Sequence, residues 1–390
     1  MKYDFDEVID RRHSGSVKWD GPDNELPMWV ADMDFKAAPE IIAALHKRVD
    51  HGVYGYCGDD PEWYAAYSSY FKAAHDWNID KGSLLFCTGV VPVLSSSVRK
   101  LTEIGDEVVV CPPVYNIFYN SIVNNARIPL EVPLLYDGSE YEIDWDGLEK
   151  AFAHPKAKLF ILCNPHNPVG KIWNKDELVR IAELAKKHNV IVLSDEIHGE
   201  ITPLDKPYVP FLTVGETAKE VGYAAISPTK CFNLAGIQTA AIVIDNPEIR
   251  AKVNRQINTD EVAEPNVFAT VAAIAAFNEG RAWLSELRRY VFDNRAFAEK
   301  YINENIPGLK AIHGEATYLL WVDCHGVTDD DVALASFLRE KAALRLSSGN
   351  VYGKGGQGFL RINLACPRSL VEEGMKRLKL GVDSFEKLPR

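Results

Sequence analysis

Several apolar segments of this 390-residue sequence are followed at once by polar residues that could do chemistry. Lys230, Asp195 and Asn167 come just after the runs YAAIS, VIVLS and KLFILC, and Gly89 lies in a CTGVV turn. A lysine amine is a nucleophile and, when its pKa is lowered, also a base. Ligands of open α/β sheets bind beyond the carboxyl ends of the strands. We therefore expect the amine, the acid, the amide and the glycine turn to share one crevice.

Each of these residues also has an ordinary structural explanation. Most lysines are solvated surface charges, as Lys230 could be. Asp195 could cap a helix that follows its strand, and Asn167 lies in an Asn-Pro turn. The functional interpretation therefore rests on the combination and not on any one residue.

Two other motifs are interpreted structurally. Gly353, Gly355 and Gly358 match GxGxxG, but a dinucleotide site needs this pattern after a strand and at the start of a helix. Here the pattern precedes the alternating segment FLRINLA, so we expect a flexible surface loop. The acidic run TDDDV (328–332) favours a helix cap over a metal site.

Hydrophobic periodicity indicates the elements that must position the chemical residues. From about residue 84, short apolar runs alternate with amphipathic stretches, which predicts a buried and mostly parallel sheet. Residues 174–189 predict a helix that Asn174 and Glu177 begin with a capping box. A helix is also predicted over 39–51, and long helices are expected within 265–305.

The hydrophobic pattern of the sequence changes after Pro307, where segments that alternate apolar and polar residues, such as TYLLWVD, are separated by helical stretches. This pattern predicts a second, α+β domain. We predict a large domain over 47–285 and a discontinuous small domain that joins 1–46 to 286–390.

Composition limits the classes of function. Lys and Arg total 43 against 55 Asp and Glu, a formal net charge of −12, which argues against a nucleic-acid or anionic-membrane partner. The seven cysteines contain no CxxC pair and predict reduced thiols, no disulfide framework and no zinc site. Without a secretory-type start or a membrane-length apolar run, we expect a cytoplasmic protein.

Several motifs together resemble a known family. NPHNPVG, SDEIH and SPTKCFNLAGIQ occur in the order found in the fold-type I pyridoxal 5'-phosphate (PLP) enzymes, the aspartate aminotransferase superfamily. The similarity covers essentially the whole chain. SVKWD, LPMWVADMDF, YGY, TGVVP and RINLACPR resemble most the cystathionine β-lyase or C–S lyase subgroup. The resemblance implies PLP as cofactor, a large α/β/α domain with a mostly parallel seven-stranded sheet, and a smaller α+β domain.

The resemblance assigns roles around the cofactor ring. Lys230 would bond to the cofactor aldehyde and later move the α-proton of the substrate. Asp195 would pair with the protonated pyridine nitrogen, which keeps the ring an electron sink. Asn167 would donate to the phenolic oxygen. Tyr115 would stack on the ring, although an aromatic residue at a strand end could equally belong to the core. Lys230, Asp195 and Tyr115 are thus the predicted catalytic residues.

The resemblance also assigns the phosphate contacts. Gly89, Val90 and Val91 would place backbone N–H groups at the start of a helix, where anions bind. Ser227 would add a hydroxyl. Tyr56 would reach the phosphate and substrate from the neighbouring subunit of a homodimer, unless it is simply a core or surface tyrosine.

Arg361, in the alternating segment FLRINLA, would bind the substrate α-carboxylate with two parallel hydrogen bonds. Its alternative is an outward-facing strand arginine. The chain departs from many superfamily members at Gln238, where they have arginine, and at His198, where they have tyrosine. His198 is placed among the cofactor-binding residues, with an ordinary interior histidine as the alternative.

The resemblance finally implies an activity on a small amino acid. The leading expectation is β-elimination from L-cystathionine or a related cysteine S-conjugate, which gives a thiol, pyruvate and ammonia. One alternative is an aminotransferase that uses the same cofactor and residues. Another is a protein of this fold with a regulatory binding role.

Overall fold

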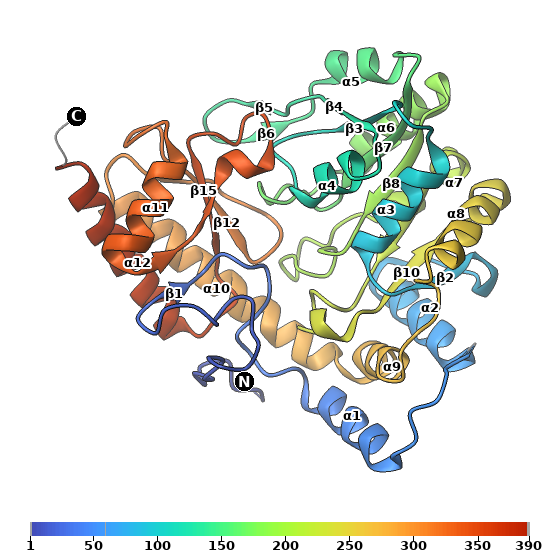
Figure 1. Ribbon diagram of the computed structural model, residues 1–390, viewed down its shortest axis with the longest axis horizontal. Coiled ribbons are helices and arrows are strands. Elements are labelled where there is room, and N and C mark those ends of the chain that lie inside the picture. Colours follow the sequence, from blue (N-terminus) through green and yellow to red (C-terminus); the bar gives the residue numbers. More distant parts are fainter. Residues whose placement is uncertain (1, 59, 388–390) are drawn as a thin grey trace.

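The centre of the molecule is a seven-stranded mixed sheet, shown in Figure 1 by a computed structural model that describes residues 2–58 and 60–387. Its strands are, in spatial order, β2 (Leu84–Cys87), β10 (Ala240–Val243), β9 (Gly222–Ile226), β8 (Ile191–Asp195), β7 (Ala157–Cys163), β3 (Glu107–Val110) and β4 (Ile128–Glu131). From β9 to β4 every neighbouring pair is parallel, and β10 is antiparallel to both of its neighbours. The mostly parallel sheet and the α/β class are therefore confirmed.

Both faces of this sheet are buried. Successive side chains of a strand point to opposite faces, so each strand contributes to two apolar clusters. On β3, Val109 belongs to one apolar cluster while Val108 and Val110 belong to another. The second cluster is covered by α3 (Val90–Leu101), α4 (Ile117–Val123) and α8 (Pro247–Thr259). The first is covered by α2 (Pro61–His75), α5 (Trp145–Phe152), α6 (Lys175–His188), α7 (Glu216–Val221) and α9 (Ala269–Glu279).

Local sequence signals set the ends of the helices. At the start of α6, Asn174 Oδ1 accepts from Glu177 N at 3.0 Å, and Glu177 Oε2 accepts from Asn174 N at 2.7 Å. This is the predicted capping box. Helix α1 (Pro39–His51) ends as predicted at Gly52, whose φ of 72° is a left-handed conformation that glycine adopts without strain.

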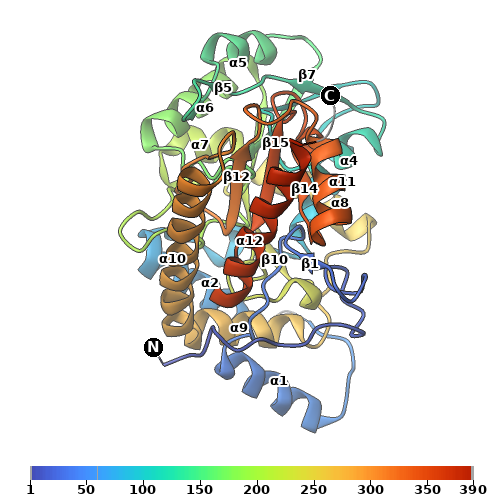
Figure 2. The same cartoon turned by 90° about the vertical axis from the view of Figure 1, so that its left-hand side faces the viewer.

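A second, four-stranded antiparallel sheet lies beside the first. Its strands are, in spatial order, β11 (Lys310–Ala311), β12 (Leu319–Asp323), β15 (Phe359–Asn363) and β14 (Ser347–Ser348). Figure 2 shows α10 (Arg281–Asn305) and α12 (Arg368–Phe385) in front of β12 and β15. Their apolar residues share one cluster with the strands and with α11 (Asp331–Ala342).

The N-terminal arm packs against this second unit. Strand β1 (Leu26–Pro27) pairs in parallel with β13 (Leu344–Arg345). A short hairpin, β5 (Leu135–Tyr136) with β6 (Tyr141–Glu142), lies in sequence between β4 and β7 of the large sheet. The boundary predicted between residues 285 and 286 falls inside the continuous helix α10, so the division into two domains stays a prediction. Position 1 and positions 388–390 of the predicted small domain lie outside the described residues. No helix within 2–58 and 60–387 has the length and apolarity needed to cross a bilayer.

Candidate active site

A cavity of ≈ 270 Å³ opens beyond the carboxyl ends of β7, β8 and β9, beside the start of α3. Eight residues predicted from the sequence line it: Gly89, Val90, Val91, Tyr115, Asn167, Asp195, His198 and Lys230. Parallel strands end at the same edge of the sheet, and this is why residues that are widely separated in the sequence meet here. Lining residues that did not receive a role from the sequence are Ala31, Thr88, Pro92, Cys163, Ile197, Thr229, Ala235, Gln238 and Thr239.

Lys230 is held inside this cavity and is not a solvated surface charge. Its Nζ donates to the Ala31 carbonyl oxygen at 2.5 Å. Burial lowers the pKa of the Lys230 amine to about 8, and the nearby Arg361 cation acts in the same direction. Asp32 and Asp195 oppose this shift. The amine is therefore much closer to its neutral, nucleophilic form at physiological pH than an ordinary lysine.

Asp195 is the last residue of β8 and is also buried. Burial raises the pKa of its carboxyl to about 7, against the lowering effects of a backbone hydrogen bond and of Lys230. Within the described part of the chain, Asp195 Oδ1 accepts a hydrogen bond from Ile197 N at 3.1 Å. One hydrogen bond offsets only part of the cost of burying the ionised carboxyl. A cationic hydrogen-bond donor placed in the cavity would therefore stabilise the carboxylate of Asp195.

His198 is buried, but it is not a satisfied interior histidine. Its Nδ1 has no hydrogen-bond partner within the described part of the chain. Burial lowers the pKa of the imidazole well below its usual value, and Lys230 and Arg361 add to the effect. The ring is therefore neutral, with a buried polar atom that a ligand could satisfy. Its place among cofactor-binding residues stays a prediction.

Arg361 faces the cavity wall from β15 of the second sheet, which excludes an outward-facing arginine. Its Nη1 donates to Asn167 Oδ1 at 3.2 Å, and its Nη2 donates to the Trp29 carbonyl oxygen at 3.0 Å. Its Cζ lies 4.9 Å from the ring centroid of Tyr352. The guanidinium is buried and, among the described residues, forms no ion pair within 4.0 Å. It is thus available to a carboxylate.

The start of α3 supplies the anion-binding end of the cavity. Gly89 is the N-cap, and no side chain within residues 2–58 and 60–387 caps the first N–H groups of the helix. Such groups, together with the helix dipole, bind phosphate-like anions. Ser227, predicted to add a hydroxyl, bonds instead to Thr229 Oγ1 and the Thr239 carbonyl oxygen, both at 2.7 Å. Thr229, and not Ser227, is among the residues that line the cavity.

The sequence did not assign the threonines of this region, although each gives a weak signal. Thr88 precedes the predicted Gly89, and Thr229 precedes the predicted Lys230. Thr239 Oγ1 is buried and has no hydrogen-bond partner among the described residues. A threonine beside a residue of a ligand site is therefore a reasonable place to look for additional hydroxyl donors.

The N-terminal arm closes the cavity at Ala31. Its carbonyl oxygen accepts from Lys230 and also from Tyr318 OH, at 3.0 Å. The arm is fixed by buried charges, since Lys18 Nζ lies 2.7 Å from Asp34 Oδ2. The Ala31–Lys230 hydrogen bond joins residues 199 positions apart, and nothing in the local sequence indicates it.

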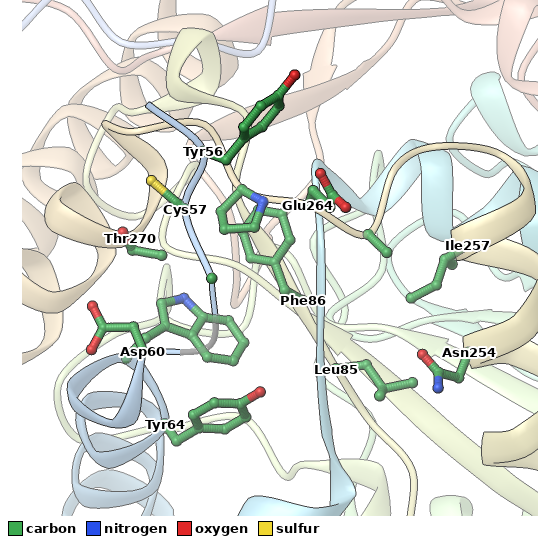
Figure 3. Close-up of a pocket in the computed structure, with 14 residues that line it drawn as sticks. Tyr56, Cys57, Asp60, Tyr64, Leu85, Phe86, Asn254, Ile257, Glu264 and Thr270 are labelled. Atoms are coloured by element: carbon green, nitrogen blue, oxygen red, sulfur yellow. The ribbon is translucent and has the colours of Figure 1, made fainter. Parts of the chain in front are cut away.

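Tyr56 is the one predicted site residue that lies well away from this cavity. It is fully exposed, on the segment between α1 and α2. Figure 3 shows it at one end of a separate surface pocket of ≈ 590 Å³, with its ring directed away from Tyr64 and Phe86. Its contact with a cofactor in its own chain is not supported, and a contact across a subunit interface stays a prediction.

Comparison with known proteins is consistent with this site. The model of the aminotransferase class I and II family matches residues 30–378, so the chain belongs to that family. It is 38% identical to cystathionine beta-lyase PatB of Bacillus subtilis (strain 168), over 96% of this chain and 98% of that protein. It is 35% identical to protein MalY of Escherichia coli (strain K12), over 96% and 98%. The solved structure of cystalysin from Treponema denticola, which contains a PLP cofactor, superposes with a TM-score of 0.95 at 33% identity, over 98% of this chain and 100% of that one.

The lowered pKa of Lys230 predicts an unusual pH dependence of its reactivity. Because the pKa falls from 10.5 to about 8, the neutral amine accumulates as the pH rises through 8 and not through 10.5. Reductive methylation of Lys230 by formaldehyde, followed by mass spectrometry on protein freed of cofactor, should reach half of its maximal rate near pH 8. Arg361→Met should move this midpoint to higher pH, since a cation that lowers the pKa is lost. A wild-type midpoint near 10.5 would contradict the assignment.

Proposed function

We propose that the protein is a PLP-dependent carbon–sulfur lyase that acts on L-cystathionine or a related cysteine S-conjugate. The observation that carries the proposal is the buried Lys230 amine, which faces the same cavity as the Asp195 carboxylate and the uncapped start of α3. The relatives named cystathionine beta-lyase support the choice of reaction. The products would be a thiol, pyruvate and ammonia.

The residues present fit PLP. The cavity offers a nucleophilic amine for an aldehyde and, in Asp195, a carboxyl group for a pyridine nitrogen. It offers the helix start at Gly89 for a phosphate. Asn167 uses its Oδ1 for Arg361, and its NH₂ group remains to donate to a ring oxygen. When bound, PLP supplies a carbonyl that takes up the substrate amine and an electron-poor ring that stabilises negative charge at Cα.

The side chains of the protein would bind the substrate, transfer the proton and stabilise charge. Arg361 holds the substrate carboxylate and so fixes the rotation about the Cα–N bond. Lys230, with its pKa lowered, accepts the proton from Cα. Asp195 would stabilise the protonated pyridine nitrogen, whose positive charge offsets the negative charge that develops at Cα. A thiolate is a good leaving group beside such a carbon, and therefore elimination needs neither a metal nor a redox group. Tyr115 lies on the cavity wall, where it can flank a planar ring.

Transamination is the second candidate, because the matching family is the aminotransferase class I and II family. The same lysine, carboxylate and arginine would serve it. The two reactions differ in whether the thiolate leaves or a proton is returned to the cofactor carbon. Arg361 can bind the one carboxylate that both substrate classes share, so only the products separate the two activities.

A homodimer that completes each site is part of the same proposal. Tyr56 is fully exposed, and its neighbours Val53 and Tyr54 are more than half exposed. Val91 lines the Lys230 cavity and is also exposed, at 39%. Exposed apolar residues on the cavity lining and on the separate segment that carries Tyr56 favour coverage by another chain. A second copy that places its Tyr56 at this cavity would add a second tyrosine to the one, Tyr115, that already lines it.

A cytoplasmic location is proposed on the state of the thiols. All seven cysteines are free, and six of them are buried. Free, scattered cysteines are typical of proteins kept in a reducing compartment. The seven include Cys163 on the cavity wall, where oxidation would obstruct the site.

The products test the reaction. Purified protein loaded with PLP should form pyruvate, ammonia and thiol from L-cystathionine in equal amounts, without an added keto acid. Lys230→Ala should lower kcat by about 10²–10⁴-fold, because the group that moves the proton is gone. Lys206→Ala, which removes an exposed lysine, should leave kcat unchanged. Amino transfer to a keto acid in the absence of pyruvate formation would replace the lyase with the aminotransferase.

Subunit mixing tests the shared site. Tyr56→Phe and Lys230→Ala homodimers should each have low activity. A hybrid of the two variants keeps one complete site, with Lys230 from one chain and Tyr56 from the other, and should regain up to about half of the wild-type activity. Hybrids verified by native mass spectrometry that remain as inactive as their parents would count against sharing in trans.

A further inference from the structure

The glycine-rich loop (residues 349–358) connects β14 to β15, the strand that carries Arg361. It lies at the surface as expected from its GxGxxG pattern, with Asn350, Val351, Lys354 and Gly355 exposed, and parts of it are folded tightly on themselves. A Cβ at Gly349 would overlap the carbonyl oxygen of Gly356, and a Cβ at Gly353 would overlap the Tyr119 hydroxyl. The absence of a side chain at these glycines thus permits close packing of the loop.

A single carboxylate closes both ends of this loop. Asp331, the first residue of α11, is buried. Its Oδ2 accepts from Asn350 N at 2.9 Å, and its Oδ1 accepts from Gly358 N at 3.0 Å. The preceding Asp330 performs the predicted capping, since its side chain accepts from Ala333 N at 2.9 Å. Within TDDDV, therefore, one aspartate caps the helix and the next fastens the loop.

The fastened loop holds Tyr352 between the two sheets. Its carbonyl oxygen accepts from Val114 N at 2.9 Å, one residue before Tyr115 on the cavity wall. Its ring is buried, with Trp321 edge-on at 5.5 Å on one side and the Arg361 guanidinium at 4.9 Å.

The guanidinium of Arg361 depends on this ring for its position. Its guanidinium donates to two uncharged oxygens, those of Asn167 and Trp29, and its buried Nε has no partner among the described residues. An aromatic face attracts a cation and restrains its plane. Displacement of Tyr352 would therefore leave the carboxylate-binding fork of Arg361 poorly aimed.

We propose that Asp331 is a positioning residue for recognition of the substrate carboxylate: it fastens the loop, the loop holds Tyr352, and Tyr352 aims Arg361. The inference rests on the proposed function in one respect, that Arg361 binds the carboxylate of an amino acid. Asp331 itself touches neither the cavity nor the reacting atoms.

Matched variants separate this role from general stability. Asp331→Asn keeps the shape of the side chain but turns one acceptor into a donor that faces a backbone N–H. Asp330→Asn makes the same chemical change one residue away and retains a good helix cap. Tyr352→Phe keeps the aromatic face beside Arg361, whereas Tyr352→Leu removes it.

The first measurement is binding of (methylthio)propanoate to the PLP-loaded protein by calorimetry. This ligand has the thioether and carboxylate of the substrate and no amine. We expect about tenfold weaker binding for Asp331→Asn and for Tyr352→Leu, with Asp330→Asn and Tyr352→Phe close to wild type. Hydrogen exchange at Asn350 and Gly358 should accelerate about tenfold in Asp331→Asn, because both amides lose a fixed acceptor.

The second measurement is turnover of S-methyl-L-cysteine, where KM should rise about tenfold in the two weakened variants and kcat should change far less. Unchanged binding and exchange in Asp331→Asn would overturn the proposal, and so would equal losses in Asp330→Asn. If Asp331→Asn does not fold, the Tyr352 pair decides: equal binding by the Phe and Leu variants would refute the role of the ring. Absence of pyruvate from every variant would instead refute the lyase, while the binding comparison would still test Asp331.

Discussion

Burial of an amine and a carboxyl group in one cavity is the constraint on which the rest of the structure depends. Asp195 is buried and Lys230 is partly buried, and desolvation moves both pKa values toward the neutral form of each group. Hydrogen bonds within the described residues offset only part of the desolvation cost. The Lys230 amine donates to one carbonyl oxygen, and the Asp195 carboxyl accepts from one backbone N–H. Such a pair is stable only inside a scaffold that is rigid and well packed, which the doubly covered parallel sheet provides.

The second sheet and the N-terminal arm complete what the first sheet begins. The large sheet brings Asp195 and Lys230 to one edge, and β15 brings Arg361 into hydrogen-bond contact with Asn167 on the wall of the same cavity. The arm supplies the Ala31 carbonyl for Lys230 and the Trp29 carbonyl for Arg361. Relative movement of these units would therefore change the surroundings of both cations at once, which couples substrate recognition to the environment of the reactive amine.

Sequence reasoning succeeded where structure is local or where a motif is dense in chemistry. The helix at Asn174 follows from its capping box, and the position of Asp195 follows from an apolar strand that ends in an acid. It failed where a contact joins distant segments without a local pattern, as in the Ala31–Lys230 hydrogen bond. The fastening of the glycine-rich loop was not foreseen, because it comes from a carboxylate on another element, Asp331. The predicted contacts of the site residues with a cofactor involve a ligand, and that of Tyr56 also involves a second subunit. These contacts therefore stay predictions.

The measurement that tests the account most directly is the turnover of Asp195→Asn, with the PLP content and folding of the variant verified. An amide of the same shape cannot hold the positive charge that the account places opposite Asp195. We predict that kcat for pyruvate formation falls about 10²-fold or more, while PLP stays bound and the thermal transition changes little. Wild-type turnover by a fully loaded Asp195→Asn enzyme would contradict the central claim that Lys230 and Asp195 act together in this cavity.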